Sequence, residues 1–156
     1  MLRQLRYARR AALLALSFLA LGACSADEDA HEVEVDFMRI TAGAQTITVN
    51  STGAVTGGPI ALNTGVARSI SVAFLAADMT SDALAEHADD FQVSVEVPAG
   101  VTFTRTGPFA GTLTASAAGS YNVGFALLHI EENHEDFGPF NVPVSVTAAP
   151  VAVAQR

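Results

Sequence analysis

The sequence has no lysine and no tryptophan, and it has a single cysteine among its 156 residues. Without lysine the chain cannot form a Schiff base, and a lone cysteine excludes an internal disulfide. Charged side chains are also scarce, at 15% of the chain, whereas 50% of the residues are hydrophobic. This length and composition are typical of one ordinary domain with its own core, not of a disulfide-stapled miniprotein or a multidomain machine.

Signatures of the common catalytic sites are missing as well. The sequence contains neither the G-x-S-x-G motif of serine hydrolases nor a phosphate-binding loop that ends in Gly-Lys-Ser/Thr. No spacing singles out one serine, one histidine and one aspartate as a triad. We therefore expect a protein that is not an enzyme.

The few charges are segregated along the chain. Four of the eight basic residues, all of them arginine, lie in the first ten positions, whereas all sixteen acidic residues lie at or after Asp27. The formal charge of −8 therefore joins a basic leader to an acidic body. Because nucleic-acid binding requires cations that replace condensed counterions, the acidic body predicts no nucleic-acid partner.

The first 24 residues indicate a secretion signal. A basic start is followed by the apolar run 11–23, which is shorter than the about 20 residues that cross a bilayer. The run ends in Leu21-Gly22-Ala23-Cys24, which resembles the lipobox of bacterial lipoproteins. This resemblance implies cleavage before Cys24, acylation of its thiol and a periplasm-facing membrane anchor. Ser25, in place of the aspartate that retains lipoproteins at the inner membrane, favours the outer membrane.

The alternative is an uncleaved anchor, or an ordinary signal peptide with a chance cysteine. If cleavage occurs, residues 24–156 carry four arginines and sixteen acids, a formal charge of −12. We then expect a signal peptide over 1–23, a lipidated cysteine with a solvated acidic tether over 24–32, a folded domain over 33–149 and a tail over 150–156.

From Val33 onward, apolar and polar residues alternate with the period of two that half-buried β-strands show. Turn-forming residues interrupt the pattern about every ten residues. These features predict an all-β fold, an antiparallel sandwich of about 7–9 strands. A phase change at Met38 predicts a β-bulge, and 81–89 is the one helix candidate.

The segment 91–147 is similar to bacterial immunoglobulin-like modules of the group 2 kind. A strand is followed by the short strand VTFTRTG and by a hairpin that contains the turn Ala117-Ala118-Gly119-Ser120-Tyr121. Such a turn precedes the penultimate strand in those modules. The resemblance implies an immunoglobulin-like sandwich and carries no information about activity.

The histidines are the main candidates for chemistry. His129 ends the strand that begins near Tyr121, and His134 lies five residues later, in the acidic run 131–136. If this strand and the next form a hairpin, both imidazoles lie at one end of the sheet. Because imidazole nitrogen and carboxylate oxygen suit Zn²⁺ and Cu²⁺, we predict a metal site formed by His129, His134 and Asp136.

A third histidine could complete this site. His87 lies in the acidic loop 86–90, which could share one end of a sandwich with the first loop; His31 is the weakest candidate. The segment 125–144 also resembles a His-x4-His hairpin of uncharacterised bacterial lipoproteins, for which no activity is established. Two simpler interpretations stay open, because exposed loops collect charge and His129 could cap a core strand without binding a metal.

Calcium is the competing ion, because four aspartates gather in one stretch, although no EF-hand loop is present. These are Asp78, Asp82, Asp89 and Asp90. Our leading hypothesis is a lipid-anchored envelope protein that captures zinc or copper and hands it to a partner such as a metal transporter or receptor. The alternative is a structural or protein-interaction module of the envelope with no metal role.

Overall fold

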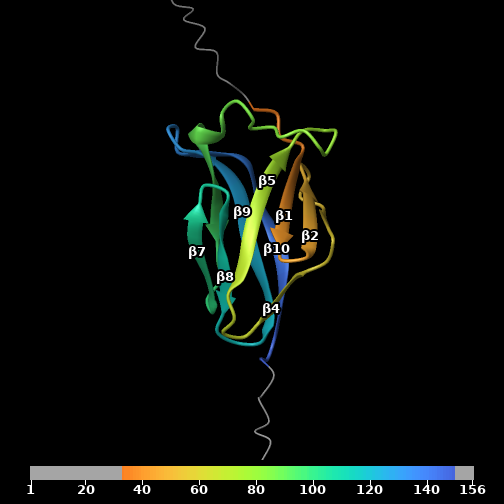
Figure 1. The fold of residues 1–156 in the computed structure, drawn as a ribbon, viewed down its shortest axis with the longest axis vertical. Helices are drawn as coiled ribbons and strands as arrows, with labels where there is room; N and C mark the ends of the chain where they lie inside the picture. Colours follow the sequence, from red (N-terminus) through yellow and green to blue (C-terminus); the bar gives the residue numbers. More distant parts are fainter. Residues whose placement is uncertain (1–32, 150–156) are drawn as a thin grey trace, which may run out of the picture. The chain divides into compact units, whose positions relative to one another are not determined.

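Two β-sheets packed face to face make up residues 33–149, the part of the chain that the computed structural model describes (Figure 1). The predicted all-β sandwich is confirmed, with ten strands instead of 7–9 and one 3-10 helix, η1 (Ala88–Asp90). The strands are β1 (Phe37–Ala42), β2 (Gln45–Asn50), β3 (Val55–Thr56), β4 (Ile60–Asn63), β5 (Arg68–Leu75), β6 (Phe91–Glu96), β7 (Val101–Gly107), β8 (Ala110–Ala115), β9 (Gly119–His129) and β10 (His134–Thr147).

The strand order is that of an immunoglobulin-like domain with an added edge. One sheet has the order β3-β2-β1-β5-β8-β7, and the other has the order β4-β10-β9-β6. The groups β5-β8-β7 and β6-β9-β10 match the B-E-D and C-F-G strands of the immunoglobulin fold. All pairs are antiparallel except β4 and β10, which run parallel. Strands β1 to β3 form a meander that extends the first sheet beyond β5.

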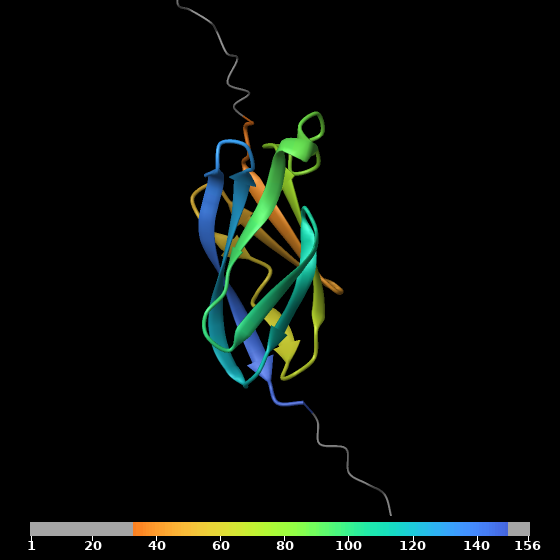
Figure 2. The same ribbon diagram turned by 90° about the vertical axis from the view of Figure 1, so that its left-hand side faces the viewer.

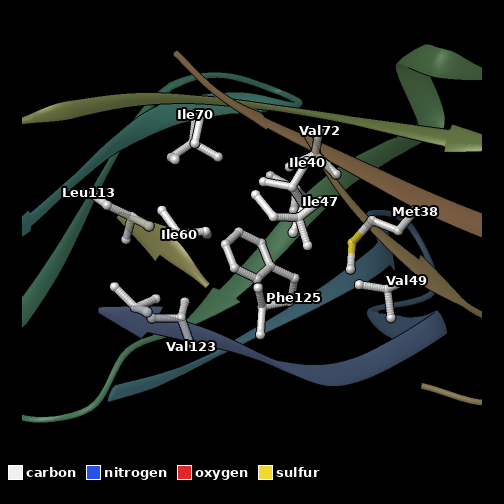
Figure 3. Packing of buried hydrophobic residues seen from close by; sticks show 14 of the residues in the cluster. Met38, Ile40, Ile47, Val49, Ile60, Ile70, Val72, Leu113, Val123 and Phe125 are labelled. Carbon is white, nitrogen blue, oxygen red and sulfur yellow. The ribbon is translucent and has the colours of Figure 1, made fainter. Parts of the chain in front are cut away.

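The core lies between the two sheets and is entirely apolar. Alternate residues of most strands point inward, so that β1 buries Met38 and Ile40, while β9 buries the continuous run 123–127, which includes Phe125. Figure 3 shows these side chains meeting from both sheets. No polar or charged side chain is buried within residues 33–149. Every described strand lies within residues 33–149, so a chain that begins at residue 25 includes all of them.

Two local sequence predictions are wrong. The register of β1 against β2 is continuous from Phe37 to Ala42, so there is no bulge at Met38. The alternation of apolar residues changes phase at Met38 because Val35 precedes β1 and belongs to no ladder.

The helix expected over 81–89 is also absent, and turns followed by η1 take its place. The start of the segment pairs with the end of β5. Asp82 forms an antiparallel bridge to Leu75, and the Ala83 N–H donates to the Phe74 carbonyl at 3.0 Å. Leu84 packs into the core with 2% of its surface exposed.

Tyr121 near the start of β9 makes a contact typical of immunoglobulin-like domains. Its hydroxyl donates a hydrogen bond to the Ala117 carbonyl at 3.1 Å, across the turn that the sequence resemblance singled out. A tyrosine near the start of strand F that bonds to the backbone a few residues upstream is a hallmark of that fold. The likeness to an immunoglobulin-like sandwich therefore extends to its side-chain interactions.

Charge is distributed unequally along the sandwich. The start of the described chain, the loop 76–90 and the β9–β10 loop lie at one end, as Figure 2 shows for the green and blue loops. This acidic end carries eleven of the twelve carboxylates of residues 33–149, and Glu96, at the far end of β6, is the twelfth. The six-stranded sheet carries no carboxylate on any of its strands. The acidic end also holds every histidine that the structure describes.

Candidate metal centre

The β9–β10 hairpin brings the two predicted histidine ligands together. Strand β9 ends at His129, a loop of residues 130–133 follows, and β10 begins at His134, directly opposite His129 in the ladder. The two imidazole centroids lie 5.7 Å apart. The return strand thus begins at His134 itself, and both histidines belong to the sheet instead of to a loose loop.

Asp136 reaches the histidines because β10 bulges at this point. Glu135 pairs with Leu128 and Phe137 pairs with Leu127, so Asp136 is an extra residue without a partner on β9. The bulge turns its carboxylate toward the hairpin, where Oδ1 lies 2.5 Å from Nε2 of His134. The Asp136 side chain is 16% exposed, which is low for a carboxylate at a loop end.

Together, His129, His134 and Asp136 form a group that could hold a metal ion. One ligand atom from each lies within 4.8 Å of the other two, and no other such group occurs in the part of the chain that the structure describes. Two imidazole nitrogens and one carboxylate oxygen are a ligand set that suits zinc or copper(II). Three protein ligands leave a fourth position for water or for a donor from another molecule.

Packing fixes the orientation of one imidazole. The ring of His129 lies against that of Phe91, with centroids 4.7 Å apart and planes inclined by 30°. Phe91 is buried and pairs with His129 across β6 and β9. The His129 side chain is 19% exposed, whereas that of His134 is 52% exposed. Of the two histidines, His129 therefore lies at the rim of the core and His134 is open to solvent.

Glu132 is a neighbour of both histidines that sequence reasoning did not single out. Its Oε2 lies 3.1 Å from Nδ1 of His134 and 3.7 Å from Nδ1 of His129. In the sequence it is one of four carboxylates within six residues, and nothing in their spacing distinguishes it. Only the conformation of the loop, in which Asn133 has a φ of 51°, selects it.

His87, the other predicted ligand, is not a member of the group. Its loop does meet the hairpin as expected, because the Ile130 N–H donates to the Asp90 carbonyl at 2.8 Å. His87 itself has Nδ1 at 3.7 Å from a carboxylate oxygen of Asp90. His31 and the proposed lipidation site Cys24 lie outside the described residues.

The four aspartates proposed for calcium do not converge within residues 33–149. Asp78 instead accepts hydrogen bonds from the backbone of Thr80 and Ser81 and from the Ser81 hydroxyl, and Asp82 accepts one from the Leu84 N–H. Hydrogen bonds from Ser81, then Thr80, hold the pKa of Asp78 well below its ordinary value. These carboxylates organise the turns of the loop.

Comparison with known proteins places this geometry in no family. No protein-family model matches the chain, and no curated protein matches it significantly. No helix within residues 33–149 is long and apolar enough to cross a membrane. The geometry of the hairpin is thus the basis on which a function can be argued.

Proposed function

We propose that this protein is a lipid-anchored protein of the bacterial envelope that binds a divalent transition metal, zinc or copper, and transfers it to a partner. The ligands are His129, His134 and Asp136. The observation that carries the proposal is the convergence of their ligand atoms within 4.8 Å at the tip of a hairpin. The proposed role is binding and transfer without catalysis.

The ligand set favours zinc or copper over calcium. Calcium takes six to eight oxygen ligands, whereas two of the three groups in this site offer nitrogen. Zinc and copper(II) accept imidazole and carboxylate together, and their sites tolerate a ligand from solvent or a partner. The exposure of His134 supports exchange, because an acceptor protein can approach that ligand directly.

The proposed anchor agrees with the position of the site. The described chain starts at Val33 at the acidic end, where the hairpin also lies (Figure 1). Eight residues separate Cys24 from Val33, and at about 3.3–3.6 Å per residue they reach roughly 30 Å. Acylation of Cys24 would therefore keep the metal site within a short distance of the bilayer, where a membrane transporter or receptor could receive the ion.

Isothermal titration calorimetry of residues 25–156 with Zn²⁺ and with Cu²⁺ tests the metal site. We expect one ion per chain, and we expect the His129→Ala/His134→Ala double variant to give no heat of binding. Circular dichroism must show that the variant keeps its β-sheet signal. Equal affinities of the wild-type and the double variant would refute the proposal.

His87→Ala is the matched control, because His87 lies in an acidic loop at the same end and outside the ligand group. We expect its metal affinity to stay close to that of the wild-type. A loss as large as that of the double variant would instead place His87 in the coordination shell.

The anchor requires its own experiment. In a Gram-negative host, the full-length chain should partition into detergent and acquire label from a fatty-acid analogue, whereas Cys24→Ala should do neither. Fractionation of outer from inner membrane then tests the expectation from Ser25. Unlabelled wild-type protein would leave the metal proposal standing and refute the lipoprotein proposal.

A structural or protein-interaction module is the second candidate, and one observation favours it. The outer face of the six-stranded sheet presents exposed or half-buried hydroxyl residues and no carboxylate. They include Thr41, Thr46, Thr48, Ser69, Ser71, Thr112 and Thr114. A partner retained from envelope extract in chelator, and lost when Thr41 and Ser71 are changed to Arg, would favour this function over metal transfer.

A further inference from the structure

Glu132 lies between the two histidines without belonging to the ligand group. It stands in the loop 130–133, its side chain is 56% exposed, and its nearest ring nitrogen is Nδ1 of His134 at 3.1 Å. That distance is within the range of an N–H···O hydrogen bond to a carboxylate. The same oxygen, Oε2, lies 3.7 Å from Nδ1 of His129. One carboxylate oxygen therefore faces the same nitrogen of both rings.

The opposite side of the His134 ring faces a different carboxylate. Its Nε2 lies 2.5 Å from Oδ1 of Asp136. A neutral imidazole has one protonated and one unprotonated nitrogen, and only the unprotonated nitrogen binds a metal. When His134 binds an ion, one of the two carboxylates can accept the remaining N–H, and the other lies beside the nitrogen that binds the ion. The two carboxylates thus have different roles.

The ligand group decides which carboxylate has which role. Asp136 converges with the two histidines and its side chain is 16% exposed, whereas Glu132 is outside the group and its side chain is 56% exposed. Metal-bound histidines commonly donate their other N–H to a carboxylate, which sets the tautomer and the ring orientation. We propose that Glu132 is the positioning residue of this site: it accepts the Nδ1–H of His134 and so presents Nε2 to the metal beside Asp136.

This assignment rests on the proposed metal function and adds a carboxylate that controls it. In the metal-free protein Nε2 of His134 already lies 2.5 Å from Asp136, so an ion must displace the proton shared in that contact. An acceptor at Nδ1 favours this exchange, because it holds the remaining ring proton on the side away from the metal.

The tautomer can be read directly. Two-bond ¹H–¹⁵N correlation spectra of residues 25–156, with ¹⁵N-labelled histidine, distinguish protonated, unprotonated and zinc-bound ring nitrogens. In the wild-type with Zn²⁺ we expect zinc on Nε2 of His134 and the proton on Nδ1. In Glu132→Ala with Zn²⁺ we expect this single tautomer to be lost, with zinc found on both ring nitrogens of His134, because no acceptor then holds the proton on Nδ1. Zinc on Nδ1 of His134 in the wild-type would make Glu132 a ligand and overturn the assignment.

Zinc affinity provides the second readout. Loss of an outer-shell carboxylate typically lowers metal affinity about 10–100-fold, which we expect for Glu132→Ala. Glu132→Gln keeps an acceptor oxygen and should recover part of the loss. Glu131→Ala removes the same charge from the same loop, and among the described residues Glu131 makes no ion pair with either histidine, so it is the matched control.

The outcomes separate the two proposals. Equal zinc affinities of Glu132→Ala and Glu131→Ala would overturn the positioning role and leave the metal site intact. A wild-type protein that binds no zinc and no copper would overturn the proposed function and this assignment with it. A tenfold or greater difference between the two alanine variants, together with the tautomer change, would support the assignment.

Discussion

The imidazole of His129 rests on the buried ring of Phe91, with centroids 4.7 Å apart, so a core residue holds a metal-ligand candidate in place. Phe91→Leu should lower the free energy of unfolding by about 1–3 kcal/mol and also weaken zinc binding, because the His129 ring loses its support. Urea unfolding and calorimetry measure the two effects. Phe125→Leu is the control, since Phe125 is equally buried on β9 but four residues from His129. It should lose stability and keep zinc affinity; parallel losses of affinity would show that Phe91 has no specific role.

Asp136→Asn tests the bulge ligand. The substitution keeps the shape of the side chain and removes its charge, so zinc affinity should fall by more than the roughly 10–100-fold that loss of an outer-shell partner costs. Glu135→Gln removes the same charge from the neighbouring exposed position, and its effect should stay below about fivefold, the range of a surface charge pair. Similar affinities for the two variants would mean that charge alone, and not the bulge geometry, attracts the ion.

The lowered pKa of Asp78 predicts that stability depends on pH. Hydrogen bonds from Ser81 and Thr80 place its pKa in the folded protein well below the ordinary value of 3.8. A carboxylate with a depressed pKa contributes stability that is complete above its unfolded pKa and is lost as the pH falls toward its folded pKa. The difference in unfolding free energy between the wild-type and Asp78→Asn should hold from neutral pH to about pH 4 and shrink below it. In Ser81→Ala, the carboxyl ¹³C titration of Asp78 should move up toward 3.8; an unchanged titration would show that Ser81 does not depress this pKa.

Tyr121→Phe removes the hydroxyl that bonds to the Ala117 carbonyl. We expect a loss of about 1 kcal/mol in unfolding free energy, the usual net value of one hydrogen bond. Because Tyr121 is near the start of β9 and His129 is at its end, zinc affinity should not change. Urea unfolding measures the stability, and calorimetric titration with zinc measures the affinity. A loss of zinc affinity in Tyr121→Phe would contradict the expectation that the two ends of β9 act independently.

Much of the sandwich is encoded in short-range alternation. The strand expected at the start of the segment 91–147 is β6, and the segment VTFTRTG coincides with β7, because apolar residues at every second position can only bury one face of a strand. The meander β1 to β3 is harder to predict. Val35 continues an apparent alternation ahead of Phe37, yet it packs at the rim of the core and belongs to no ladder.

The candidate site could be predicted in part for the same reason. Alternation along β9 places His129 at the strand end, and the hairpin then brings His134 opposite it. The contribution of Asp136 depends on a bulge in β10, and that of Glu132 depends on the positive φ of Asn133. Both are long-range or backbone effects that carry no periodic signal. The sequence predicts His87 as a ligand, and it is not one of the group. Its loop reaches the hairpin, but its side chain does not join the ligand group.

The gathering of carboxylates at one end of the sandwich has a consequence for an anchored molecule. Anionic headgroups would repel the acidic end to which the tether connects, and this repulsion decays over a Debye length of about 8 Å at physiological salt. The tether allows roughly 30 Å, several times that distance. The domain would therefore stand off from the lipid surface across a layer of water, and cations attracted into that layer would meet the histidine hairpin first.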